Sequence, residues 1–142
     1  MANKILVDDG KTWLGARCMS AAHPPLDGNV HVHLFTNNST PTDTDVLGDY
    51  TEATYPGYAA QLLSGATDGG IDADDRDTWN WPVQTFEATG TPGSPETVYG
   101  AYYTDSGDTT LLWVERFASP FTFTNNGDGF TLPPTFSFGS IF

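Results

Sequence analysis

The sequence has almost no cysteine and very few positive charges. Cys18 is its single cysteine, which excludes an intrachain disulfide and therefore a small secreted scaffold held together by such bonds. Lysine and arginine together number 5, against 18 aspartates and glutamates, so the formal net charge is −13. Because nucleic acids and most membrane surfaces are also anionic, we expect neither to be a partner.

Long apolar runs and catalytic signatures are missing as well. No stretch approaches the ~18 apolar residues of a membrane-spanning helix, and residues 1–9 hold no apolar signal core. We therefore expect synthesis and folding in a cytoplasm. The sequence also has no G-x-S-x-G, nucleotide-binding or H-E-x-x-H motif. We predict a protein that is not an enzyme and that needs no cofactor.

The residues that are present favour one folded domain. Hydrophobic residues make up 38% of the 142 residues and aromatic residues 13%, which is enough to close a core at this length. Disorder is therefore not expected, despite the charge.

The hydrophobic pattern predicts one helix followed by short strands. The helix covers residues 10–19, capped by Asp8 or Asp9. Pro82 should confine its strand to an edge or a bulge. Turn residues predict two hairpins, the first from 97–103 and 111–117 and the second from 121–124 and 130–132. The expected strands are 30–35, 58–63, 79–86, 97–103, 111–117, 121–124, 130–132 and 135–138.

These elements predict an all-β fold, an antiparallel β-sandwich with one short N-terminal helix. Jelly-roll and immunoglobulin-like connectivity both remain open. We expect residues 1–28 to form an N-terminal arm and residues 29–142 to form the sandwich. Strand 97–103 is apolar on both faces, with Val98, Gly100 and Tyr102 on one side, so its second face must meet a helix, a loop or another chain.

Two groups of residues are candidate cation sites. His31 and His33 share one face of a strand, roughly 7 Å apart, as in some metal sites of β-barrels. No carboxylate follows them closely, so the pattern favours two solvated or interface histidines and predicts no metal. The acidic loop 67–77 lacks the EF-hand spacing and is expected to be a solvated loop, with calcium as the lesser alternative.

Several strand and turn segments resemble small virion proteins of tailed bacteriophages, most of all head decoration, or cement, proteins. The likeness covers about residues 30–138 and includes no catalytic motif. Its segments are Leu34–Asn38 with Pro41, Tyr50–Tyr58, Thr97–Tyr103, Leu112–Phe117 and Asn126–Asp128.

The resemblance implies a virion structural protein, often a homotrimer, that binds the capsid exterior and ties neighbouring major capsid subunits together. Aromatic anchors and strand edges are the expected means of contact. Lys4, Lys11 and Arg17 form a candidate cationic arm for an acidic capsid face. The other expected contact positions are Trp79, Trp81, His31, His33 and Phe142.

Other functions remain open at the level of sequence. A carbohydrate-binding module for host attachment would use an exposed aromatic strip. A tail or baseplate component would share the β-sandwich but attach elsewhere on the virion. A metal-dependent enzyme ranks last.

Overall fold

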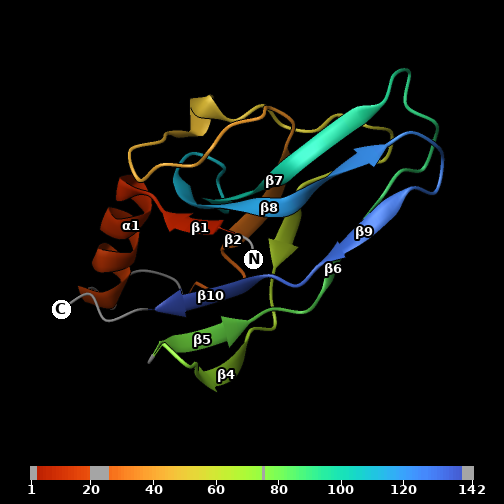
Figure 1. The fold of residues 1–142 in the computed structure, drawn as a ribbon. Coiled ribbons are helices and arrows are strands. Elements are labelled where there is room, and N and C mark those ends of the chain that lie inside the picture. Colours follow the sequence, from red (N-terminus) through yellow and green to blue (C-terminus); the bar gives the residue numbers. More distant parts are fainter. Residues whose placement is uncertain (1–2, 20–25, 75, 139–142) are drawn as a thin grey trace.

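The computed structural model describes residues 3–19, 26–74 and 76–138, which fold into antiparallel sheets flanked by one helix (Figure 1). The chain is all-β apart from this helix and a short 3-10 turn, η1, and is sandwich-like, as predicted. Its elements are β1 (Asn3–Leu6), α1 (Asp8–Met19), β2 (Val30–Phe35), η1 (Leu47–Asp49), β3 (Gln61–Leu63), β4 (Thr67–Ile71), β5 (Asp77–Asn80), β6 (Gln84–Glu87), β7 (Glu96–Asp105), β8 (Leu111–Phe123), β9 (Gly129–Leu132) and β10 (Thr135–Phe138).

Three sheets organise the described residues. The largest has the strand order β1-β8-β7-β2-β3, a three-stranded sheet has the order β10-β5-β4, and β6 pairs with β9. The segment 1–28, expected to be an arm, contributes the edge strand β1, which pairs with β8 through residues 3–6 and 113–116. Helix α1 also packs on β8. Residues 3–6 therefore belong to the main sheet, and α1 packs against it.

The strands with the clearest alternation form where they were predicted. Strand β2 has the predicted bounds, and the hairpin of β7 and β8 is confirmed but longer than expected. The second predicted hairpin is wrong, because residues 121–123 continue β8 and pair with 96–98, while β9 pairs with β6. The turn residues correctly indicated where the chain reverses, but they did not indicate which strand pairs with β9.

Two further predictions around Pro82 are corrected. The expected strand 79–86 is two strands, β5 and β6, and Pro82 lies in the break between them. Strand β5 is therefore free to take the central place in its sheet, where an edge strand was expected. The expected loop 67–77 contains strand β4, since pairing with β5 holds residues of low strand propensity in extended form.

A bulge changes which side chains of β7 face the interior. Between the pairs Val98–Phe121 and Gly100–Arg116, the single residue Tyr99 lies opposite the four residues 117–120 of β8. Val98 and Ala101 therefore both enter the main core, although simple alternation placed them on opposite faces.

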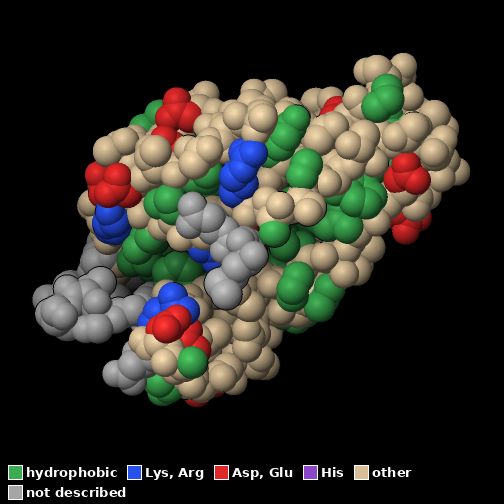
Figure 2. Space-filling model, viewed as in Figure 1, with side chains coloured by type: hydrophobic (Ala, Val, Ile, Leu, Met, Phe, Trp, Pro, Cys, Tyr) green, Lys and Arg blue, Asp and Glu red, His purple; other side chains and the backbone are tan. Residues whose placement is uncertain are grey.

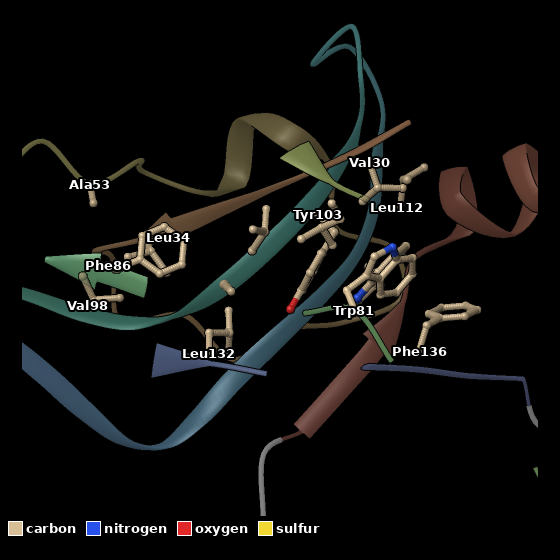
Figure 3. Packing of buried hydrophobic residues seen from close by; sticks show 14 of the residues in the cluster. Val30, Leu34, Ala53, Trp81, Phe86, Val98, Tyr103, Leu112, Leu132 and Phe136 are labelled. Carbon is tan, nitrogen blue, oxygen red and sulfur yellow. The ribbon is translucent and has the colours of Figure 1, made fainter. Parts of the chain in front are cut away.

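The main core lies between the five-stranded sheet and the smaller sheets (Figure 3). Trp81, Trp113 and Phe136 meet there, with ring centroids 6.3 Å apart for Trp81–Trp113 and 4.6 Å apart for Trp113–Phe136. On the other face of β7, Tyr102 joins a second buried cluster that includes Tyr50 from the segment after η1. A loop of the same chain thus covers the second apolar face.

Candidate functional site

The histidine cluster, defined here as His31, His33, Thr104 and Asp108, joins β2 to the β7–β8 turn. The Asp108 Oδ1 atom lies 2.8 Å from His31 Nδ1 and 3.0 Å from His33 Nε2. The Thr104 hydroxyl donates to the same oxygen at 2.8 Å and lies 3.0 Å from His33 Nε2. One carboxylate oxygen therefore faces two imidazole nitrogens and a hydroxyl.

The β7–β8 turn places Asp108 next to the histidines of strand β2. Asp108 has a φ of 54°, and it is the only non-glycine residue with positive φ in the described part of the chain. The Asp105 carboxylate accepts the backbone N–H groups of Thr109 and Thr110 at 2.8 and 2.7 Å, which closes the turn around Asp108. Partial burial opposes ionisation of Asp108, but the hydrogen bonds within the histidine cluster, that with His31 first, outweigh it and hold its pKa below the usual value.

The far side of His33 is fixed by a second carboxylate. His33 Nδ1 lies 2.7 Å from Glu52 Oε1, which also accepts the Tyr58 hydroxyl at 2.9 Å. The Tyr58 oxygen in turn accepts the Leu34 backbone N–H at 3.0 Å. The Tyr102 ring stacks on His33 with centroids 4.7 Å apart. These contacts fix the orientation of the His33 imidazole ring.

The expected solvated or interface role is wrong for His33, which is only 5% exposed and packs among residues of its own chain. His31 remains partly exposed. The carboxylate that the sequence did not supply within β2 comes from Asp108, because β2 and β7 are paired through residues 30–35 and 100–105. The turn around Asp108 was recognisable in the sequence, but its position beside the histidines was not.

The apolar segment, defined as residues 62–83, holds most of the large apolar side chains that reach the surface. Of the five such side chains that are exposed in the described residues, four lie in this segment, and the fifth is Val46. All five residues of β4 are exposed, and its outer edge has no partner strand among the residues described. The four side chains are Leu62 (49% exposed), Ile71 (64%), Trp79 (36%) and Val83 (57%).

Asp27 anchors this segment to the body of the protein. Its carboxylate accepts the backbone N–H of Ala66 at 3.0 Å, that of Gly65 at 3.2 Å and the indole N–H of Trp81 at 2.9 Å. The Ala66 hydrogen bond is the largest cause of a lowered Asp27 pKa, which the Gly65 and Trp81 bonds reinforce. The apolar segment is therefore held in place while its outer side chains stay exposed.

The residues expected to contact a partner differ in their exposure to solvent. Trp79 is at the surface, but Trp81 is only 4% exposed, because its ring packs on Trp113 and its N–H is bound by Asp27; a direct contact role for Trp81 is therefore wrong. Phe142 and the side chain of Arg17 lie outside the part that is described.

Lys4 and Lys11 do not project as a cationic arm. The Lys4 ammonium donates to the Thr135 carbonyl at 3.0 Å and lies 3.9 Å from Glu115. The Lys11 ammonium lies 2.7 Å from Asp8 and 3.5 Å from Asp43. Both lysines are therefore engaged by carboxylates or carbonyls of their own chain.

A shallow apolar groove beside the β8 bulge was not foreseen from the sequence. Phe117, Phe121 and Phe130 line it, and its volume is about 340 Å³. Figure 2 shows hydrophobic side chains at the surface where β8 passes β9. The bulge lies in β8 beside Phe117 and Phe121, at an irregularity that periodicity alone does not reveal.

Comparisons with known proteins give no relative for this chain. No family model, no curated protein and no solved structure matches it. Among the described residues, no helix has the length and apolar character needed to cross a membrane.

Proposed function

We propose that this chain is a non-enzymatic virion protein of a tailed bacteriophage. It decorates the head, binds the capsid exterior and stabilises contacts between neighbouring major capsid subunits. The observation that carries the proposal is the concentration of exposed apolar side chains in the apolar segment, beside an unpaired strand edge. The family resemblance of residues 30–138 supplies the kind of particle.

The apolar segment has the chemistry of a protein-docking surface. Exposed apolar groups gain free energy when a partner covers them, and a free strand edge offers backbone groups for strand addition. The same segment is rich in carboxylates, with Asp68, Asp72, Asp74 and Asp77 among residues 67–77. The complementary partner is a coat-protein face with apolar pockets rimmed by lysine or arginine.

The exposed aromatic surface argues for a protein partner over a sugar. Trp79 is the only aromatic residue among the exposed large apolar side chains of the residues described, whereas a strip that stacks successive sugar rings needs several. Most other rings pack against one another, as Tyr103 does on Trp113 with centroids 4.5 Å apart.

The test uses capsids of the phage that encodes the chain, stripped of accessory proteins. The purified chain is added, and the particles are imaged and then challenged with heat or low salt. The proposal expects density on the shell exterior and a gain in resistance. No density, or no gain despite binding, overturns it, and binding to a glycan array but not to capsids favours the carbohydrate-binding alternative.

Matched variants locate the contact. Ile71→Ser combined with Val83→Ser removes two exposed apolar side chains of the apolar segment, and Val46→Ser removes the one exposed elsewhere. We expect the double variant to lose at least ~10-fold in capsid affinity, because interface anchors carry most of the binding energy, and Val46→Ser to bind like the unmodified chain. Equal binding by all three overturns the assignment of the apolar segment.

The proposed assembly is a homotrimer. Light scattering of the free protein should give three times the chain mass of 15.3 kDa. A monomer in solution together with triangular density on the shell would place trimer formation on the capsid, and isolated single copies there would overturn the trimer.

A further inference from the structure

We propose that His31 Nδ1, His33 Nε2 and Asp108 Oδ1 bind a divalent transition-metal ion, with zinc as the best match. The ion links strand β2 to the β7–β8 turn. This proposal rests on the histidine cluster alone and does not depend on the capsid assignment.

The three atoms already converge. All of them lie within 4.8 Å of one another, and the two imidazole nitrogens lie 2.8 and 3.0 Å from the same carboxylate oxygen. Tetrahedral zinc with bonds of about 2.0–2.1 Å places its ligand atoms about 3.3 Å apart. Small side-chain rotations therefore convert the hydrogen-bonded arrangement into a coordination site, with no movement of the strands.

The hydrogen bonds of His33 favour a cation at Nε2. When the Nδ1–H group of His33 donates to Glu52 Oε1 at 2.7 Å, the neutral ring directs the lone pair of Nε2 toward Asp108, which is itself an acceptor. A metal ion on Nε2 satisfies the lone pair of His33 and the charge of Asp108 together.

Glu52 also has the position of a supporting carboxylate. Histidines that bind metals usually donate their other N–H to a carboxylate or carbonyl, which fixes the tautomer and the ring plane. Glu52 is in turn held by the Tyr58 hydroxyl at 2.9 Å, and stacking on Tyr102 fixes the ring of His33. Such support is needed for a site of defined geometry.

The donor set selects the class of metal. Two imidazoles and one carboxylate suit zinc and its neighbours, whereas calcium and magnesium prefer sites made of oxygen. The Thr104 hydroxyl or a water is placed to complete the coordination, since Thr104 Oγ1 lies 2.8 Å from Asp108 Oδ1. The exposed Asp108 and partly exposed His31 leave a path from solvent.

Titration calorimetry of the full chain with zinc chloride, and in parallel with calcium chloride, tests the site. We expect one zinc per chain and no calcium binding at the cluster. His31→Ala and Asp108→Asn should each weaken zinc binding at least ~100-fold, and Glu52→Gln about 10–100-fold. Asp74→Asn makes the same chemical change at an exposed carboxylate of the segment 67–77 and should bind zinc normally.

A measurement on the unmodified chain keeps the test valid if a variant fails to fold. Anomalous scattering from crystals of the unmodified chain grown with zinc should place the ion between His31, His33 and Asp108. An ion elsewhere, no zinc binding by the unmodified chain, or equal affinity in folded His31→Ala and Asp108→Asn overturns the proposal.

Discussion

The central strands β7 and β8 and the apolar segment differ in how far their large side chains are exposed. In the sheet, Trp113 is 1% exposed and Tyr102 4%, since the small sheets cover one face and the segment around Tyr50 covers the other. In the apolar segment, Ile71 and Val83 remain more than half exposed. The described part of the chain therefore closes its own interior and exposes most of its large apolar side chains within the apolar segment, which is where a partner is expected.

Replacing a tryptophan in each region gives the largest contrast. Trp113→Ala should lower the free energy of unfolding by about 3–5 kcal/mol, because it leaves a cavity in the main core. Trp79→Ala, with Trp79 already 36% exposed, should cost about 1 kcal/mol or less. Urea unfolding of both variants measures the difference, and similar costs would contradict the division into a closed interior and an exposed segment.

Asp27→Ala tests how the two regions are joined. Loss of the carboxylate leaves the buried indole N–H of Trp81 without its acceptor, at a cost of about 1–3 kcal/mol. Hydrogen exchange should show faster exchange in β4 and β5, with β7 and β8 unchanged. Uniform acceleration throughout the chain would mean that the apolar segment is not a separate unit of stability.

Glu115 gives the closed region a distinctive pH dependence. Burial raises the pKa of this carboxyl, against the attraction of Lys4 and the hydrogen bond from the Tyr103 hydroxyl. The folded state therefore holds this proton more tightly than the unfolded state. The resulting stability is fully present below the ordinary value near 4.5 and is lost as pH rises through the folded pKa.

Glu115→Gln should remove that loss. The difference in unfolding free energy, variant minus unmodified chain, should become more favourable to the variant as pH rises from 4 toward neutrality. Glu87→Gln, at an exposed position in β6, is the matched control. Parallel pH curves for Glu115→Gln and the unmodified chain would rule out this role.

The smallest expected effect on stability belongs to Ile71→Ser. Because Ile71 is 64% exposed, the unfolding free energy should change by no more than about 0.5 kcal/mol. A change above 2 kcal/mol, measured by urea unfolding, would show that Ile71 supports the fold. It would then no longer serve as a clean probe of capsid binding.

Local patterns in the sequence predicted part of this structure. The alternation of residues 30–35 and the turn at 104–108 were sufficient to find β2 and the β7–β8 hairpin. The partner of β9, the central position of β5 and the strand at 67–71 depend on pairing between distant segments. The residues on either side of a turn do not indicate such pairing.

The histidine cluster, too, could be predicted only in part from local sequence patterns. The two histidines were evident from their spacing, but Asp108 lies 75 positions after His33 in the chain. Its placement depends on β2 pairing with β7 and on a backbone angle that few residues adopt. Sequence spacing therefore found two ligands and missed the third.

The bulge opposite Tyr99 divides the long β7–β8 hairpin into two parts. Beyond it, Phe121 and Phe123 contact Phe130 with ring centroids 5.1 and 6.0 Å apart, while the other half carries Asp108 at its turn. Such an irregularity interrupts the ladder of backbone hydrogen bonds, so fraying that starts at the phenylalanine end can stop there. We therefore expect the two ends of this hairpin to open independently of each other.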